Sequence, residues 1–207
     1  MALTTTIYFV RHGDVENPDQ LFYGRLPGFP LSERGREQAE AAARHLRSKA
    51  VRAIYASPQR RTQETGKILQ SGLEQSPPLH TEPLIDEIKS RFDGATQQEM
   101  DERSWNFYRE VEEDFEQPAD ILARMRKFIQ GMRRDHQGEE IVAVSHADPI
   151  VFIWMWVLEI PLLAENRRLL DQYGLRDDYP AKASISTFHF QTDAEDERPS
   201  YSYARPY

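Results

Sequence analysis

Short apolar runs separated by longer polar segments dominate this chain. Three of these runs are continuous, at residues 7–10, 53–56 and 141–144. A continuous apolar run this short is typical of a strand buried on both faces, as in a parallel sheet. A further strand is predicted at residues 184–190, and the proline-flanked segment 79–88 is expected to include an edge strand. The pattern therefore predicts a mostly parallel central sheet.

The segments between these strands carry apolar residues at helical spacing. Helices are expected at residues 32–49, 58–70 and 149–158. Their predicted starts coincide with capping residues, namely Ser32, Ser57-Pro58 and Asp148-Pro149. The last helix is apolar almost all round, so it should be buried. Alternating strands and helices predict an α/β fold, a three-layer α/β/α sandwich.

Residues 95–136 are strongly charged with scattered aromatic side chains, and Pro118 divides them into two predicted helices. We expect them to form a helical insertion that caps the end of the sheet. The chain has no clear linker, so residues 1–207 are interpreted as a single domain. The polar segment 193–207 is either a frayed tail or a strip along a partner, and its tyrosines are the reason for expecting a possible homodimer.

Basic residues stand where the predicted strands end. Arg11-His12-Gly13 follows the first apolar run, Arg60 and Arg61 fall in the first turn of the helix after the second, and Ser145-His146 follows the third. Ligands of open α/β sheets bind just past the carboxyl ends of the strands. Arginine offers a planar set of donors that matches phosphate oxygens, and a neutral imidazole can attack phosphorus. The pattern therefore favours a phosphate site, although a strand that happens to end in a basic pair remains an alternative.

Two further segments carry candidate chemistry. Asp86-Glu87 follows the predicted edge strand, where a carboxylate could act as general acid for a leaving oxygen. Arg25 lies in a loop rich in proline and glycine, residues 17–30, and is either a second substrate ligand or an exposed loop arginine.

Composition narrows the classes of function. The 207 residues include no cysteine, which excludes disulfides and cysteine-based zinc sites. A net charge of −8 argues against broad nucleic-acid binding, but a local arginine cluster can still hold a small anion. The most apolar run, residues 150–158, is too short to span a membrane, and the N-terminus lacks the features of a signal peptide. We expect a cytoplasmic protein with a small-molecule substrate and with neither nucleic-acid nor membrane partners.

Arg11-His12-Gly13, the run from Ser57 through Arg61, and Ser145-His146 together resemble the motifs of the histidine phosphatase superfamily, which has the phosphoglycerate-mutase-like fold. Residues 31–39 resemble the first helix of that family. The resemblance covers residues 6–190, with residues 95–136 as the variable insertion. Three motifs in the right order are far more specific than one.

The resemblance implies a role for each of these residues. His12 would be the nucleophile that becomes phosphohistidine, while Arg11, Arg61 and His146 would hold the phosphoryl oxygens. Glu87 would protonate the leaving group and then activate water.

The stretch after this acid, residues 88–94, departs from the family pattern and is one residue shorter, so Asp86 is the alternative acid. Val15, Thr62 and Asp148 also stand where relatives commonly have threonine, alanine and glycine. Asp148 is expected either to cap the helix or to disfavour highly anionic substrates.

Asn17 matches a family asparagine, and together with Gly24, Arg25 and Ala147 it is assigned to substrate binding. The resemblance implies neither a metal nor any other cofactor.

The expected function is metal-independent hydrolysis of a small phosphomonoester through a phosphohistidine on His12. Two alternatives stay open. A cofactor-dependent phosphoglycerate mutase uses the same residues but returns the phosphate to its substrate, although the loop Tyr23-Gly24-Arg25 resembles the phosphatase branch more. The second alternative is a non-catalytic protein that binds or regulates through a phosphorylated ligand, although binding alone does not require a nucleophile.

Overall fold

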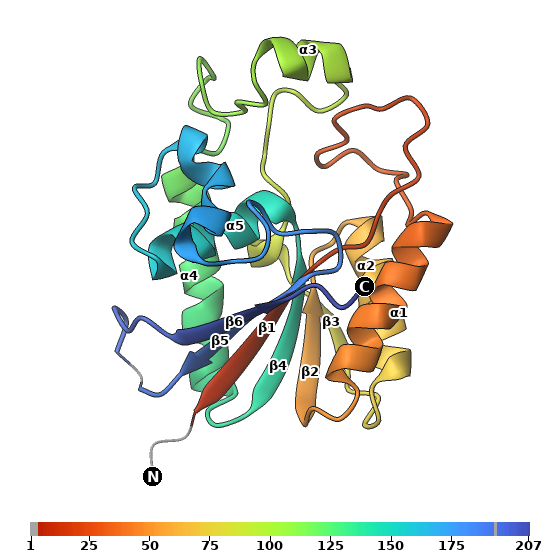
Figure 1. The fold of residues 1–207 in the computed structure, drawn as a ribbon, viewed down its shortest axis with the longest axis vertical. Helices are drawn as coiled ribbons and strands as arrows, with labels where there is room; N and C mark the ends of the chain where they lie inside the picture. The colour runs from red at the N-terminus through yellow and green to blue at the C-terminus, as the bar shows by residue number, and fades with distance from the viewer. Residues whose placement is uncertain (1–3, 193) are drawn as a thin grey trace.

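A computed structural model describes residues 4–192 and 194–207, so residues 1–3 and 193 of the predicted domain and tail lie outside it. A six-stranded sheet with the order β3-β2-β4-β1-β5-β6 forms its centre (Figure 1). The strands are β1 Thr5–Arg11, β2 Val51–Ala56, β3 Leu79–Thr81, β4 Glu140–Ser145, β5 Ile185–Phe190 and β6 Ser200–Ala204. Strands β1 to β4 run parallel, while β5 is antiparallel to β1 and β6 is antiparallel to β5. The predicted mostly parallel sheet is confirmed.

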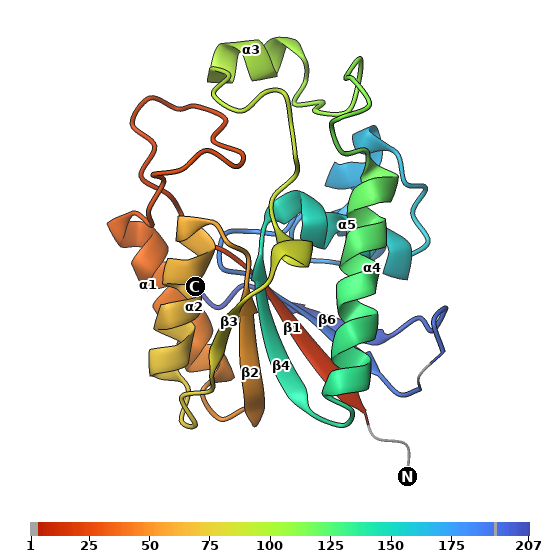
Figure 2. The ribbon, with the colours of Figure 1, turned by 180° about the vertical axis from the view of Figure 1, so that it is seen from behind.

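Helices cover both faces of this sheet, which confirms the three-layer α/β/α sandwich. Helices α1 (Glu33–Leu46) and α2 (Arg60–Gly72) lie on one face, and α4 (Pro118–Asp135) and α5 (Ala147–Val157) lie on the other (Figures 1 and 2). The shorter elements are α3 (Gln97–Glu102) and three 3-10 helices, η1 (Pro83–Ile85), η2 (Ala164–Arg168) and η3 (Leu170–Tyr173).

Strand β1 is buried on both faces, as its continuous apolar run predicts. Successive side chains of a strand point to opposite faces. Phe9 therefore packs edge-to-face against Phe128 of α4 and Phe188 of β5, with ring centroids 5.9 and 6.1 Å apart. Val10 belongs to the core cluster on the other face, which includes the small Ala42 of α1. Small side chains on α1 let that helix pack closely on the sheet.

Two of the expected helix starts are wrong by a few residues. Helix α2 begins at Arg60 with Gln59 in the cap position, so Ser57 does not cap it. Helix α5 begins at Ala147 after His146, which places Asp148 within its first turn. In both cases the expected capping side chain bonds instead to other parts of the chain, as described below.

The predicted cap is smaller than residues 95–136. Only α3 and the loop that follows it lie over the end of the sheet, whereas α4 runs along a sheet face (Figures 1 and 2). The reason is the apolar stripe of α4, which buries Phe128 and its helical neighbours in the core beneath it. The loop 17–30 joins α3 over the sheet end through a bridge between Leu21 and Thr96.

The segment after residue 193 is part of the sheet. Strand β6 pairs with β5 in an antiparallel register, with Ser186 opposite Tyr203. This pairing rules out the frayed tail, whereas contact of this edge strand with a partner is not tested by it. The possible homodimer remains a prediction. In the part of the chain that the structure describes, no helix is both long enough and apolar enough to cross a membrane.

Candidate active site

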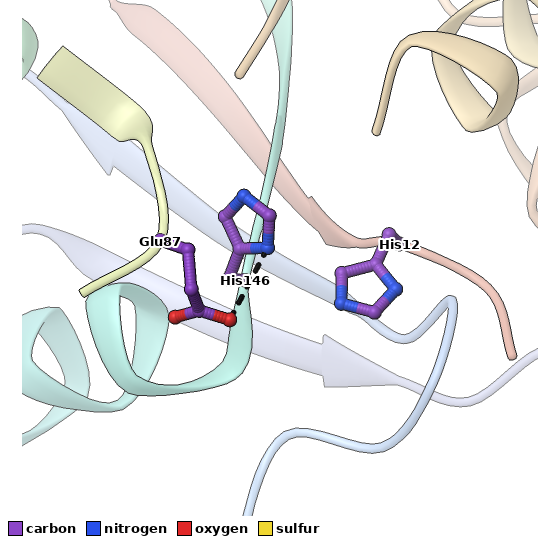
Figure 3. A group of neighbouring side chains, drawn as sticks. All are labelled: His12, Glu87 and His146. Atoms are coloured by element: carbon purple, nitrogen blue, oxygen red, sulfur yellow. Dashed lines mark ion pairs between the residues drawn. The ribbon is translucent and has the colours of Figure 1, made fainter. Parts of the chain in front are cut away.

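A cavity of about 400 Å³ opens at the carboxyl end of β1, and His12 lies on its wall. The ring of His146, the other histidine predicted to be functional, is 5.2 Å from the His12 ring between centroids. Arg11 is the last residue of β1 and His12 follows it, while His146 follows β4, the parallel neighbour of β1. Glu87 comes from the loop after η1. Figure 3 shows the His12 ring turned toward Glu87 and His146. The sheet therefore brings together residues that are far apart in the sequence.

His12 is held in one tautomer by its neighbour. Its Nδ1 lies 2.7 Å from the carbonyl oxygen of Gly13. A carbonyl can only accept a hydrogen bond, so Nδ1 carries the proton and Nε2 keeps a free electron pair. Burial lowers the pKa of His12 well below its ordinary 6.5, and the charges of Lys182 and Arg61 lower it further. His12 is thus a neutral imidazole whose free nitrogen faces the cavity.

Two glycines allow the close contact beneath this histidine. A Cβ atom on Gly13 would lie 2.3 Å from the carbonyl oxygen of Gly35 in α1, and one on Gly35 would lie 2.0 Å from that of Asp14. The loop after His12 therefore rests directly on the start of α1, and only a residue without a side chain fits at either position.

His146 is fixed by hydrogen bonds on both sides of its ring. Arg61 Nη2, which can only donate, lies 3.1 Å from Nδ1, so Nδ1 accepts. The proton of the neutral ring is therefore on Nε2, which donates to Ser57 Oγ at 2.7 Å. Ser57 in turn donates to Asp86 Oδ1 at 2.8 Å. Burial and the charge of Arg61 lower the pKa of His146 well below its ordinary value.

Glu87 and Asp86 have different positions, although they are adjacent in sequence. Glu87 lines the cavity, and its Oε2 lies 3.4 Å from His146 Nδ1 and 3.5 Å from Arg61 Nη2. Asp86 instead accepts hydrogen bonds from Ser57 and Gln59. Burial raises the pKa of Glu87 above its ordinary 4.5 and outweighs the opposing effect of Arg61. Of the two carboxylates, Glu87 is the one placed to exchange a proton in the cavity.

Both predicted arginines are anchored by backbone carbonyls. Arg11 Nη1 donates to Pro180 O at 2.6 Å, and Arg61 Nη2 donates to Gly24 O at 2.7 Å. Arg61 is only 1% exposed, whereas the adjacent Arg60 points outward and pairs with Glu64. The carbonyl oxygens hold both guanidinium groups without cancelling their charge, and of the two arginines Arg61 also has a carboxylate nearby, that of Glu87 at 3.5 Å.

Of the four residues assigned to substrate binding, two line the cavity and two do not. Asn17 and Ala147 line the cavity, and the carbonyl of Gly24 anchors Arg61. Arg25 is not among the residues that line it. Its guanidinium donates to the carbonyl oxygen of Glu87 and to the carboxylate of Glu116. The structure thus gives Arg25 a role in holding the Glu87 loop, and its contact with substrate stays a prediction.

Asp148 serves neither as the expected helix cap nor as a free charge. Its buried carboxylate accepts hydrogen bonds from Tyr108 and Tyr179 and pairs with Arg167 Nη1 at 2.6 Å. This network ties α5 to the loop after α3 and to the segment before β5. Because Arg167 balances its charge, Asp148 adds little net repulsion toward an anionic substrate.

Several cavity residues were missed by sequence reasoning. Lys182 and Tyr23 lie on the cavity wall beside His12 and are hydrogen-bonded to each other at 3.0 Å. The outer part of the cavity is lined by apolar side chains from the loop 17–30, the Glu87 loop and the loop after α3, namely Leu21, Phe22, Ile88, Trp105 and Phe107. The residues of this apolar wall lie in irregular segments, where periodicity gives no signal. Lys182 had a usable signal, because it precedes a strand antiparallel to β1 and so meets the same sheet edge as His12.

His12, Glu87 and His146 also form a group with metal-ligating atoms. One ligand atom from each lies within 4.8 Å of the other two (Figure 3). The guanidinium of Arg61 is 3.1 Å from His146 and 3.5 Å from Glu87. A cation at this point would be repelled by the arginine, so the charge distribution suits an anion better.

Comparisons with known proteins agree with this geometry. The family model described as histidine phosphatase superfamily (branch 1) matches residues 7–176. An uncharacterized protein of Mycobacterium tuberculosis H37Rv is 32% identical over 200 residues, which is 93% of this chain and 94% of that protein. Phosphoserine phosphatase 1 of Hydrogenobacter thermophilus is 30% identical over 166 residues, or 75% of this chain and 77% of that protein.

A solved structure shares the fold at lower identity. The mycobacterial glucosyl-3-phosphoglycerate phosphatase superposes with a TM-score of 0.75 at 21% identity, covering 97% of each chain. The family match covers most of the chain, including the strand ends and loops that carry His12, Arg61, Glu87 and His146. The chain therefore belongs to branch 1 of the histidine phosphatase superfamily and is an enzyme of the phosphatase type.

Proposed function

We propose that this protein hydrolyses small phosphomonoesters through a phosphohistidine on His12, without a metal ion. The observation that carries the proposal is the free Nε2 of His12 at a cavity that Arg11 and Glu87 also line, with Arg61 3.5 Å from Glu87. Phosphoryl transfer depends mainly on positioning and on fixed positive charge. This arrangement supplies both.

In the first step, His12 Nε2 attacks phosphorus and forms an N–P bond while the bond from phosphorus to the ester oxygen breaks. Glu87, whose pKa is raised by burial, gives its proton to the departing oxygen. The substrate alcohol leaves as a neutral molecule. Arg11 and Arg61 offset the negative charge on the transferring group.

In the second step, water attacks the phosphohistidine and the N–P bond breaks. The Glu87 carboxylate takes a proton from the attacking water, so it returns to its acid form. Inorganic phosphate leaves, and His12 Nε2 regains its electron pair. The hydrogen bond from Nδ1 to Gly13 keeps the ring in place throughout.

The test is the release of inorganic phosphate from a panel of phosphomonoesters in the presence of a chelator. We expect the wild type to release phosphate and to form a phosphoenzyme that is stable in alkali and labile in acid. His12→Ala should abolish both. His45→Ala is the matched control, because this histidine is exposed on α1 and should have wild-type activity.

Two results would contradict the proposal. Interconversion of monophosphoglycerates without net hydrolysis would identify a mutase instead. Phosphate binding without turnover of any ester in the panel would identify a phospho-ligand binding protein.

A further inference from the structure

Lys182 lies on the cavity wall beside His12 and has no part in the mechanism above. Its Nζ donates a hydrogen bond to Tyr23 OH at 3.0 Å. In residues 4–192 and 194–207, no carboxylate forms an ion pair with it. Two of the cavity arginines differ in this respect, because Arg167 is paired with Asp148 and Arg168 with Asp178. Arg11, like Lys182, has no ion-pair partner among the described residues. Lys182 is thus an ammonium group in a partly buried site without a countercharge.

We propose that Lys182 is a substrate-contacting residue, whose ammonium group binds a phosphoryl oxygen of the substrate next to His12. This inference rests on the proposed function, since it adds a third cation to Arg11 and Arg61. The ligand class is the phosphoryl group itself, either as the ester or as inorganic phosphate.

The charge balance of the cavity supports this assignment. Burying a cation without a partner is costly, and a bound anion removes that cost. Burial lowers the pKa of Lys182, and the charge of Arg11 lowers it further. The same ammonium group is the cation that acts most strongly on His12. A phosphate dianion at His12 would therefore lie within the field of Lys182 and would oppose both effects that lower its pKa.

The backbone around Lys182 is held firmly in place. Ala183 N donates to His12 O at 3.2 Å, which joins the lysine loop to the nucleophile. Tyr203 OH accepts a hydrogen bond from Ala181 N at 3.0 Å, and Tyr207 OH donates to the carbonyl oxygen of Lys182. Strand β6 and the residues after it thus fix the loop that carries the ammonium group. Such preorganised charge is what stabilises a transferring phosphoryl group.

The phenol of Tyr23 accepts the hydrogen bond of the Lys182 ammonium group and lies close to the other site residues. Its ring lies 4.7 Å from the guanidinium carbon of Arg61, and its ring centroid is 6.4 Å from that of His12. Burial alone would raise the pKa of Tyr23, but the charges of Lys182 and Arg61 outweigh burial and lower it. The phenol oxygen therefore accepts a hydrogen bond from Lys182 in the free protein. We expect a phosphoryl oxygen of the substrate to accept a hydrogen bond from the same ammonium group.

A purely structural role is the competing explanation. In that case Lys182 would only anchor the loop 17–30 through Tyr23, and either partner could be removed with the same effect. Tyr23→Phe removes the hydrogen bond but keeps the ammonium group. Lys182→Met removes the ammonium group and keeps the length and apolar character of the side chain. The two variants therefore separate anchoring from phosphoryl binding.

The experiment measures the affinity for inorganic phosphate by calorimetry and the values of kcat and KM for a phosphomonoester. We expect Lys182→Met to weaken phosphate binding about tenfold, equivalent to about 1.4 kcal/mol, and to reduce kcat/KM by about 10²-fold or more. Tyr23→Phe should change phosphate affinity less than about threefold. Lys182→Arg should restore most of the affinity. Lys127→Met, at an exposed position of α4, is the control.

Unchanged phosphate affinity in Lys182→Met would overturn the inference, as would equal losses in Lys182→Met and Tyr23→Phe. If Lys182→Met does not fold, Lys182→Gln is measured in its place, with the same criteria. Phosphate binding is independent of turnover. If the wild type binds phosphate through Lys182 but hydrolyses no ester, the proposed function fails and this inference stands.

Discussion

Arg61 donates from one nitrogen, Nη2, to both the carbonyl oxygen of Gly24 and Nδ1 of His146. The first bond ties the loop 17–30 to the floor of the cavity. The second determines which nitrogen of His146 carries a proton. One buried guanidinium group therefore positions both a loop above the cavity and the imidazole of His146, whose ring lies 5.2 Å from that of His12.

Replacing Arg61 should reduce catalysis far more than stability. Arg61→Lys keeps a positive charge but loses the planar set of donors. We expect kcat to fall about 10²- to 10³-fold, the loss typical for one donor to a developing charge. Steady-state kinetics check this. Arg60→Lys, at the exposed neighbour in the same helical turn, should be indistinguishable from wild type, and a large loss there would contradict the division of roles.

The two adjacent acids should differ in their effect on pH dependence. Because the pKa of Glu87 is raised, its acid form persists above pH 4.5, and activity should fall as pH rises through that pKa. We expect Glu87→Gln to remove this basic limb of the kcat profile and to lower kcat about 10²- to 10⁴-fold. The loss should be greater for alkyl than for aryl phosphates, since alkoxide leaving groups need the proton more.

Asp86→Asn is the matched comparison for Glu87. It should retain the basic limb, because the Asp86 carboxylate is engaged by Ser57, Gln59 and the backbone N of Glu87 and does not line the cavity. If the limb disappears in Asp86→Asn and persists in Glu87→Gln, the two roles are reversed.

The buried histidines should make the protein less stable in acid. His12 and His146 have pKa values lowered in the folded state, so the unfolded state binds more protons below pH 6.5. Their contribution to stability is complete above that pH and is lost as pH falls toward the folded pKa. Each can contribute up to about 1.4 kcal/mol per pH unit. Urea unfolding between pH 7 and pH 5.5 measures the slope.

Glu87 acts in the opposite direction, because its folded pKa is raised and its contribution grows as pH falls. Comparison with His146→Gln isolates one histidine from this background. The variant should show a shallower loss of stability with acid than the wild type. An identical slope would mean that His146 is not neutral in the folded protein.

The buried ion pair of Asp148 and Arg167 should contribute more to the free energy of unfolding than the exposed pair of Asp178 and Arg168. Asp148→Ala leaves Arg167 buried without a countercharge, for which we expect a loss of about 3–5 kcal/mol. Adding Arg167→Met should recover part of that loss. Asp178→Ala breaks the exposed pair with Arg168 and should cost less than about 1 kcal/mol. Free energies of unfolding in urea compare all three.

Sequence patterns predicted those parts of the molecule where local and global preferences agree. The continuous run of β1 predicted a strand buried on both faces, and the position of His12 at its end predicted the floor of the cavity. Ser57 was misassigned because serine before proline is a favourable helix cap, and nothing in its local sequence indicates that it bonds to His146 instead. Tertiary contacts decided the role of that side chain.

The upper part of the cavity could not be predicted in the same way. Arg25 is a predicted substrate ligand because it is close to His12 in sequence, and nothing in that sequence indicates that its guanidinium also bonds to Glu116. Lys182 and Tyr23 are separated by 159 positions, and their contact depends on how two irregular segments pack. Irregular segments carry no period from which a facing direction can be derived.

The contact between Gly13 and Gly35 limits how this protein can diverge. A methyl group at either position would force the nucleophile's loop and helix α1 apart, and no change at the other glycine could compensate, because each already lacks a side chain. Both positions are therefore closed to substitution, whereas much of the cavity wall is formed by side chains of irregular segments. The position of the nucleophile is thus fixed by backbone packing, while the selectivity for the substrate alcohol can change with the side chains of the surrounding loops.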